Sequence, residues 1–276
     1  MKQLMEYKII SGRVVETRRS WLSVRQAGEP VKRRAARVAG ATSEKKIKAN
    51  EISSSRELAR RINAVFLPGD ALVTPKYVAE HLPSSYEEAE DYLKKALRQY
   101  RKEFKKAYGR SPKMVWVTAN WSPSRNAPAR LHHHIVVEAE GVEMLRRLWQ
   151  GGGMSIEFLD NRGDHSDLAA YMVANVHGRP AKKKWHCSRG LADEIIYTEP
   201  VPVEDVEDVR PEKDAVIKEH ETSCDEDGHV TSSYLRCVLA EKPKVRGGKI
   251  VMPKSGKRQT ASQPSAAKSL RKGGAK

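Results

Sequence analysis

The chain has 276 residues, with 51 lysines and arginines against 35 aspartates and glutamates, and a formal net charge of +16. Hydrophobic residues make up 39% of it, which suffices for one core of about 100–150 residues rather than for the whole chain. There is no run of about 18 apolar residues and no apolar stretch near the first residue, so we expect neither a transmembrane helix nor a secretory signal. Three widely spaced cysteines, Cys187, Cys224 and Cys237, fit a reducing compartment. The excess of positive charge favours nucleic acid as the partner, although charge alone also fits a ribosomal or membrane-surface protein; we expect no membrane partner.

The charge is uneven along the chain. Residues 1–50 carry 13 basic and 4 acidic groups. Residues 200–227 carry 3 basic and 11 acidic groups, and residues 241–276 carry 11 basic groups and 1 acidic group. We therefore expect a small N-terminal strand pair around Ser11 and Gly12 plus a basic segment over 1–50, and a folded domain over 51–199. An acidic linker over 200–240 and a disordered basic tail over 241–276 would follow.

The folded region shows regular hydrophobic periods. Residues 71–78 have the pattern of a strand, and a capping box of Ser84 and Ser85 with Glu87 and Glu88 opens a helix over about 85–108, which Gly109 ends. Further strands are expected over 114–118, 131–137 and 155–159, and further helices over 142–149 and 168–176. The order strand, helix, strand, strand, helix, strand, helix predicts an α+β protein. We expect a split β-α-β antiparallel sheet (RRM-like), backed by two helices on one face.

Three consecutive histidines open the third of these strands. Because side chains alternate along a strand, His132 and His134 should point to one face and His133 to the other. Two imidazoles about 6–7 Å apart along one face can converge on a single divalent ion. The alternative interpretation is a surface histidine cluster at the end of a strand.

The last predicted helix carries Tyr171. Asp167 and Asn175 lie one helical turn before and after it, on the same side of the helix. A tyrosine with polar neighbours on both turns is typical of the edge of a site, although a tyrosine at the rim of the core has the same pattern.

Together these features resemble the HUH endonuclease superfamily, in which a His-x-His strand of an antiparallel sheet is followed by a helix that bears a tyrosine. Within the superfamily, the chain looks most like the rolling-circle replication initiator proteins (replication-associated proteins) of filamentous phages and small plasmids. The resemblance covers about Glu51 to Ala192. The resembling segments occur in the order 86–89, 115–118, 131–137, 148–151, 168–172 and 185–191.

The resemblance implies an enzyme that nicks single-stranded or hairpin origin DNA. By this likeness Tyr171 attacks a phosphodiester and becomes linked to the 5′ phosphate, while the freed 3′ hydroxyl primes synthesis. His132 and His134 would hold the divalent metal, Mg²⁺ or Mn²⁺. The chain lacks a Gly-x-x-x-x-Gly-Lys loop, so unwinding and synthesis would fall to a helicase and a polymerase of the host. The implied location is the cytoplasm of a bacterial host.

Two positions depart from the family pattern. Related proteins often carry an acidic metal ligand on the neighbouring strand, where this chain has Ala119, and a lysine one turn after the tyrosine, where it has Ala174. Mg²⁺ prefers oxygen ligands, so Asn120, Asp167 or a DNA phosphate would have to complete the site. Three alternatives stay open: a catalytically degenerate single-stranded nucleic-acid binding protein on the same scaffold, a single-tyrosine transposase, and a histidine-cluster metal-binding protein.

A basic, aromatic segment follows the last predicted helix. Lysines in this segment and an arginine after it could hold phosphates, while a tryptophan could stack on a base. The predicted DNA contacts are Lys182, Lys183, Lys184, Trp185 and Arg189. Should Tyr171 not be the nucleophile, Tyr197 is the next candidate.

Overall fold

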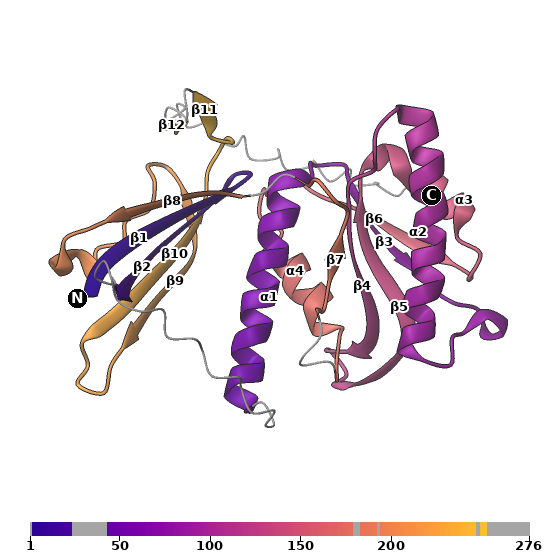
Figure 1. Cartoon of the computed structure of the whole chain (residues 1–276), viewed down its shortest axis with the longest axis horizontal. Coiled ribbons are helices and arrows are strands. Elements are labelled where there is room, and N and C mark those ends of the chain that lie inside the picture. The colour runs from indigo at the N-terminus through magenta and orange to yellow at the C-terminus, as the bar shows by residue number, and fades with distance from the viewer. Residues whose placement is uncertain (1, 24–42, 179–182, 192–193, 247–248, 253–276) are drawn as a thin grey trace, which may run out of the picture.

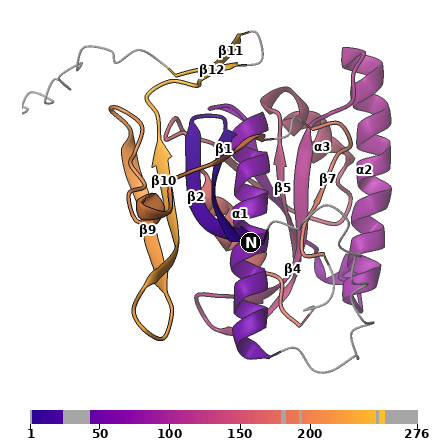
Figure 2. The same cartoon turned by 60° about the vertical axis from the view of Figure 1, so that its left-hand side comes forward.

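The computed structural model describes residues 2–23, 43–178, 183–191, 194–246 and 249–252. The protein is α+β, as predicted: the described residues form two five-stranded antiparallel sheets and four α-helices. Helix α1 (Glu44–Val65) lies between the two sheets (Figures 1 and 2). A short hairpin of β11 (Lys244–Arg246) and β12 (Lys249–Val251) follows the second sheet. None of the described helices is long and apolar enough to span a membrane.

The first sheet, which we call the central sheet, contains the histidine strand. Its strand order is β6-β3-β5-β4-β7, so β5 has two strands on each side. The elements from β3 to α4 follow the predicted order. The strands are β3 (Ala71–Pro75), β4 (Met114–Ser122), β5 (Ala127–Val137), β6 (Met154–Phe158) and β7 (His186–Cys187). The helices are α2 (Tyr86–Tyr108), α3 (Val142–Leu148) and α4 (Ser166–Ala174), with 3-10 turns at Ala79–His81 and Ala139–Gly141.

The predicted ends of α2 are confirmed. Ser85 Oγ accepts a hydrogen bond from the Glu88 backbone N–H at 3.1 Å, and Glu88 Oε2 accepts one from the Ser84 N–H at 2.7 Å. This reciprocal pair satisfies two of the N–H groups that a helix start leaves free. At the other end Gly109 has φ +70°, the left-handed conformation that a glycine adopts without steric cost.

Helices cover both faces of the central sheet, whereas the sequence predicted helices on one face only. On one face Leu93, Leu97 and Phe104 of α2 pack with α3 against Val73 and Ile135. The other face is covered by α1 and α4. There the buried residues are Leu58, Ile62, Val115, Val117, Val136, Ala169 and Met172. The hydrophobic period of α1 is confined to its C-terminal half, which is why the sequence did not predict this helix.

The predicted N-terminal strand pair is confirmed, but it belongs to a larger sheet. Strands β1 (Lys2–Ser11) and β2 (Val14–Ser23) pair along their whole length. At their turn, Gly12 has φ +60°, and a Cβ atom there would lie 2.0 Å from the carbonyl oxygen of Asn63 in α1. Only glycine permits this close approach, which brings the hairpin turn against the end of α1.

The predicted acidic linker over 200–240 is wrong. Strands β8 (Ile195–Pro200), β9 (Val216–Cys224) and β10 (Val230–Val238) join β1 and β2 in the order β8-β1-β2-β10-β9. We call this five-stranded unit the terminal sheet, since both ends of the chain contribute to it. A 3-10 turn at Val203–Val206 connects β8 to β9. The predicted disordered tail over 241–276 is wrong for its first part, because β11 and β12 pair as a hairpin there. The basic segment 24–42 and residues 253–276 lie outside the described residues.

Ion pairs join the terminal sheet to α1 and to the start of α4. Arg60 of α1 donates two hydrogen bonds to Glu16 of β2, at 2.8 and 2.6 Å, and Tyr234 of β10 donates a third at 2.9 Å. Arg236 of β10 donates to Asp164, just before α4, at 2.9 Å. These contacts connect the terminal sheet to the helix that carries Tyr171.

Candidate nicking site

His132 and His134 lie on the central strand of the central sheet, on the face opposite α2 and α3. Their Nε2 atoms are 3.1 Å apart. Two nitrogens that each lie about 2.1 Å from one ion are about 3.0 Å apart in octahedral and about 3.4 Å apart in tetrahedral geometry. The observed separation fits two ligands of a single divalent ion, and it equally fits a hydrogen bond between the two rings.

The Nδ1 atoms of both rings are held by neighbouring groups. His132 Nδ1 lies 2.8 Å from the carbonyl oxygen of Arg130, which can only accept, so this nitrogen carries the proton. His134 Nδ1 lies 3.2 Å from Thr74 Oγ1 on the adjacent strand β3. Partners on Nδ1 orient the rings and leave Nε2 for a metal, as in most metal-binding histidines.

Burial keeps both rings in the form that binds metals. It lowers the pKa of His134 to about 3, with smaller contributions from His132 and from the ammonium of Lys76. Burial also lowers the pKa of His132, again with a contribution from Lys76. Both imidazoles are therefore neutral at physiological pH, and a neutral imidazole nitrogen is a metal ligand.

His133 points to the opposite face, as the alternation predicted. It is fully buried, with its Nε2 2.6 Å from Tyr77 Oη and its Nδ1 3.1 Å from Thr118 Oγ1. The three histidines thus have two different environments: His132 and His134 face the cavity, and His133 is a hydrogen-bonded core residue.

Tyr171 of α4 lies beside the histidine pair. Its ring centroid is 5.0 Å from that of His134, and the side chain is 47% exposed. Burial of the ring, together with the charge of Glu157, raises the pKa of Tyr171. The phenol is therefore protonated and accessible to a ligand in solution.

The carboxylate missing from position 119 has a counterpart on a different strand. Glu157 of β6 lines the same cavity as His132, His134 and Tyr171, a space of about 410 Å³. The two candidates from the sequence lie elsewhere: Asp167 lines a different cavity, against α1 and the terminal sheet, and the Asn120 side chain bonds to the backbone of His177. Ser155 and Glu157 alternate on a predicted strand, but only the strand order reveals that this strand neighbours β3.

The cavity also contains cations. Lys76, Arg125 and Arg130 line it with exposed side chains, against the single carboxylate of Glu157. Lys76 forms a β-bridge with His132, which fixes the backbone of this lysine beside the histidine pair. A cavity with three cations, one carboxylate and a phenol is suited to a phosphodiester.

The predicted DNA contacts after α4 do not line this cavity. Trp185 is 2% exposed and belongs to the core under α1, so the predicted base stacking is contradicted. Lys184 is paired with Glu51 of α1 at 2.6 Å, and Lys183 lies over the Trp185 ring at 4.3 Å. Arg189 is exposed, and Lys182 lies outside the described residues.

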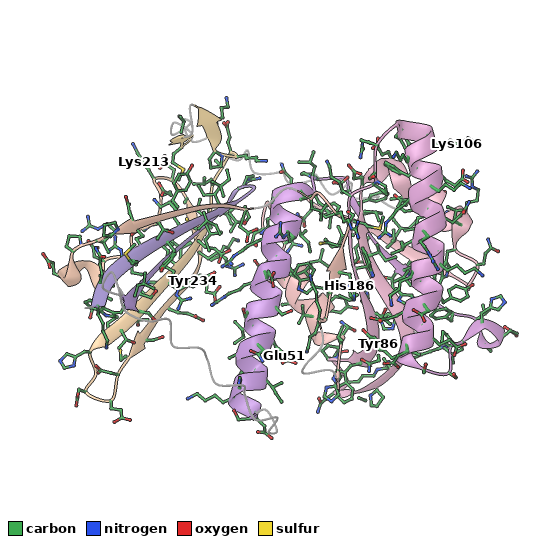
Figure 3. The ribbon with its side chains drawn as sticks, viewed as in Figure 1. Glu51, Tyr86, Lys106, His186, Lys213 and Tyr234 are labelled. Atoms are coloured by element: carbon green, nitrogen blue, oxygen red, sulfur yellow. The ribbon has the colours of Figure 1, made fainter. Side chains whose placement is uncertain are left out.

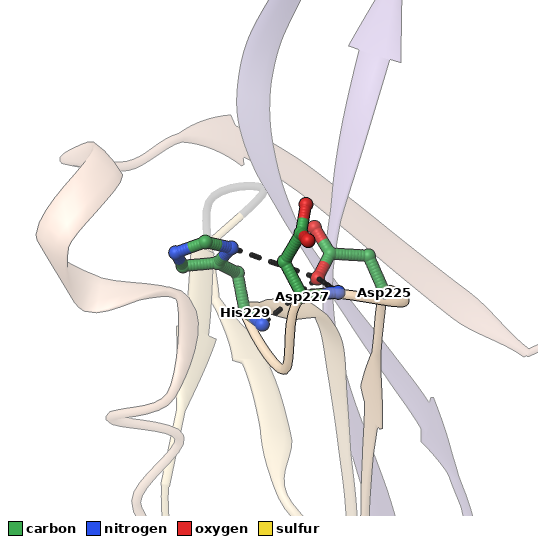
Figure 4. A group of neighbouring side chains, drawn as sticks. All are labelled: Asp225, Asp227 and His229. Carbon is green, nitrogen blue, oxygen red and sulfur yellow. Dashed lines mark hydrogen bonds and ion pairs between the residues drawn. The ribbon is translucent and has the colours of Figure 1, made fainter.

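Two further candidates lie on the terminal sheet: Tyr197, the alternative nucleophile, and a second possible cluster of metal ligands. Tyr197 is on β8, so it does not share the histidine cavity. Asp225, Asp227 and His229 form the one group of three such ligands within 4.8 Å of one another in the described chain (Figure 4). All three are exposed, and Asp225 Oδ1 already accepts hydrogen bonds from the backbone N–H groups of the other two residues. A tight turn therefore accounts for their proximity.

Comparison of the chain with protein-family models, with curated proteins and with solved structures gave no match.

Proposed function

We propose that this protein is a rolling-circle replication initiator of the HUH endonuclease type. It would nick and rejoin single-stranded or hairpin origin DNA of a phage or plasmid through a covalent bond to Tyr171. The observation that carries the proposal is the convergence of His132 and His134, with Nε2 atoms 3.1 Å apart, beside an accessible tyrosine.

The strand order supports the finer fold of this proposal. Strands β3, β4, β5 and β6 follow one another in the chain and lie in the order β6-β3-β5-β4. The helices α2 and α3, which connect β3 to β4 and β5 to β6, pack on the same face. This order and this placement of the helices support a split β-α-β sheet.

The proposed reaction is a transesterification. Tyr171 Oη forms a bond to phosphorus, the bond from phosphorus to the 3′ oxygen breaks, and that oxygen takes up a proton while the phenol releases its own to water. Rejoining is the reverse reaction, and it needs no ATP because the phosphotyrosine bond conserves the energy of the phosphodiester. The exposed side of the Tyr171 ring gives water access for the proton transfer.

His132 and His134 would hold the metal, and Glu157 or a phosphate oxygen would supply the oxygen ligand that Mg²⁺ or Mn²⁺ prefers. When bound, such an ion would polarise the scissile phosphate and neutralise part of its charge. Lys76, Arg125 and Arg130 would orient the strand by its phosphates. A host helicase and polymerase would complete replication, in the cytoplasm of a bacterial cell.

The test is a pool of single-stranded oligonucleotides with a randomised central segment, labelled at the 3′ end and incubated with the protein and Mn²⁺ or Mg²⁺. The wild-type protein should give a labelled covalent species on a denaturing protein gel, which protease removes. Tyr171→Phe should lose it while keeping DNA binding, and His132→Ala/His134→Ala should lose it together with Mn²⁺ binding measured by calorimetry. Mn²⁺, which tolerates imidazole better, should give more product than Mg²⁺ at equal concentration.

Tyr197→Phe is the matched control. It also removes a phenol oxygen, but from the terminal sheet, and it should leave the covalent species unchanged. If the wild-type protein gives no covalent species with either metal, the non-catalytic nucleic-acid binding alternative replaces this proposal. A single-tyrosine transposase would use the same residues and would differ by joining the bound strand to a separate target DNA.

A further inference from the structure

A row of cations follows the outer helix α2 on the side away from the nicking site. From residue 94 onward, α2 carries seven basic residues and one acidic residue, Glu103. The basic residues are Lys94, Lys95, Arg98, Arg101, Lys102, Lys105 and Lys106. Both views place α2 at the outer edge of the molecule, and Figure 3 shows Lys106 on its exposed side.

These residues form two rows on the helix. Lys94, Arg98, Arg101 and Lys105 are separated by three or four residues, so their side chains follow one line along the surface, which we call the β7 row. Lys95, Lys102 and Lys106 form an outer row about 90° further round the helix. Glu103 lies on the opposite flank from the β7 row.

The β7 row faces the edge of the central sheet. The Arg101 guanidinium lies 5.4 Å from the ring centroid of Trp116 on β4, and the His186 ring of β7 stacks on the same tryptophan at 5.6 Å. Arg189, the second residue after β7, is exposed. Burial, and then the nearby charge of Arg189, lower the pKa of Arg101. The two guanidinium groups are thus close enough to repel each other.

These cations have few acidic partners. Lys94 pairs with Glu90 at 3.4 Å and with Asp91 at 3.2 Å, but Arg98, Arg101, Lys105 and Arg189 have no ion pair among the described residues. Like charges placed together without counter-charges disfavour the free protein and favour the binding of a polyanion.

The shape and chemistry of the row select the kind of polyanion. The row is straight and about 16 Å long, at about 1.5 Å per residue. Duplex DNA carries a charge every 1.7 Å or so along its axis, and guanidinium groups bind phosphates in a bidentate manner. Leu93, Leu97 and Phe104 of α2 are buried, and Tyr108 at its end is the one exposed large apolar residue of this helix, so the helix has no apolar side to insert into a membrane.

We propose that the β7 row of α2 together with Arg189 is a second nucleic-acid-binding surface, which binds the phosphate backbone of duplex DNA. It lies on the α2 side of the central sheet, whereas His132 and His134 face the other side. The inference depends on the proposed function in one respect: an initiator works where a duplex origin adjoins the strand that it nicks. The surface would hold the duplex while the histidine cavity takes the single strand.

Two triple variants with equal charge loss test the proposal. The first, Arg98→Gln/Lys105→Gln/Arg189→Gln, removes three cations of the surface. The second, Lys95→Gln/Lys102→Gln/Lys106→Gln, removes three cations of the outer row of the same helix. All six side chains are exposed, so both proteins should fold, which circular dichroism checks. Binding of a fluorescent duplex of arbitrary sequence is measured by anisotropy over a series of salt concentrations.

The first variant should bind the duplex more than about tenfold more weakly at physiological salt, with a salt slope lower by about 2.7, because each lost phosphate contact contributes about 0.9. The second variant should lower the slope by less than about 0.9, the contribution of a single phosphate contact. If the first variant does not fold, Arg98→Gln alone should lower the salt slope by about 0.9, the contribution of one phosphate contact.

Equal losses in the two triple variants, or no loss in either, would overturn the proposal. The proposal would also be overturned if the first variant bound the duplex as well as the wild-type protein does but no longer bound vesicles of phosphatidylserine and phosphatidylcholine. The same holds if it no longer bound an acidic protein. Duplex binding needs no cleavage, so this result is independent of whether Tyr171 forms the covalent species.

Discussion

The middle histidine shows how one residue type serves two purposes in consecutive positions. His133 is fully buried between Tyr77 and Thr118, whereas His132 is half-buried and contacts the exposed carbonyl of Arg130 and the ring of His134. A buried polar group that loses its partner costs about 1–3 kcal/mol. Stability and metal binding should therefore respond to different histidines.

His133→Leu should lower the free energy of unfolding by about 2–4 kcal/mol, since it removes the imidazole partner of two buried hydroxyls and leaves the Tyr77 hydroxyl only its longer bond to the Ala89 carbonyl. His132→Leu should lower it by less, about 1 kcal/mol, because the carbonyl partner of His132 can bond to water and only His134 Nε2 loses a buried partner. Urea denaturation without metal measures both changes. Equal losses in the two variants would show that the buried hydrogen bonds do not stabilise the sheet.

Stability without metal should fall as the pH is lowered. Burial lowers the pKa of His133 to about 3, with smaller contributions from His132 and His134, whereas an unfolded histidine titrates near 6.5. Between these values the unfolded chain binds a proton that the folded chain does not, so acid favours unfolding. Between pH 6 and 5, His133→Leu should reduce the slope of the unfolding free energy by about 1 kcal/mol per pH unit. An unchanged slope would mean that His133 is charged in the folded protein.

At the scale of elements, helix α4 is held at its start by a residue outside it. Asp164 Oδ1 accepts hydrogen bonds from the Ser166 N–H at 3.0 Å and the Ser166 hydroxyl at 2.6 Å, while Arg236 of the terminal sheet donates to its Oδ2. The carboxylate thus caps the helix that carries Tyr171 and ties it to the other sheet.

Asp164→Ala should lower the free energy of unfolding by about 1–3 kcal/mol, through loss of the cap and of the bond to Arg236. It should also slow formation of the covalent species, since the helix that positions the nucleophile loosens. Asp160→Ala is the control. Because the partner of Asp160, Arg162, is exposed, this substitution should lower the free energy of unfolding by less than about 0.5 kcal/mol. Thermal melts and the gel assay measure the two effects. Equal stability losses would exclude a special role for the cap.

Local patterns predicted the elements from β3 to α4, because each has its own period and end signals. Helix α1 was missed since only Leu58, Ala59, Ile62 and Val65, near its end, are buried along with Asn63. Strand β9 is an exposed, acidic edge strand, and its structure depends on pairing with β10, which in turn pairs with β2 about 200 residues away. Such long-range pairing leaves no local period.

The same limit applies to the site. The sequence identified His132, His134 and Tyr171 because each follows a local rule or a motif. Glu157 was missed because its position depends on β6 lying beside β3, which only the assembled sheet defines.

At the scale of the whole molecule, a buried carboxylate joins the two sheets. Glu16 of the terminal sheet is 4% exposed and is neutralised by Arg60 of α1, with a further bond from Tyr234. A buried ion pair contributes little net stability over an apolar pair, but removal of one partner leaves a buried charge.

Arg60→Leu should therefore lower the free energy of unfolding by about 3–5 kcal/mol, whereas Arg60→Leu/Glu16→Leu should restore much of the loss. Lys94→Ala, which removes an exposed ion pair, should cost less than about 1 kcal/mol. Urea denaturation of the three variants gives the coupling. A double variant as unstable as Arg60→Leu would mean that the two sheets do not dock through this pair.

The most direct test of the account is to identify the residue that becomes linked to DNA. Trypsin should release residues 163–182 as one peptide, because Arg179 precedes Pro180, and Tyr171 is the single tyrosine in it. We predict that mass spectrometry of the nuclease-trimmed covalent species will find a 5′-linked nucleotide on this peptide, at Tyr171. A nucleotide on the peptide that contains Tyr197, or on no tyrosine at all, would contradict the account.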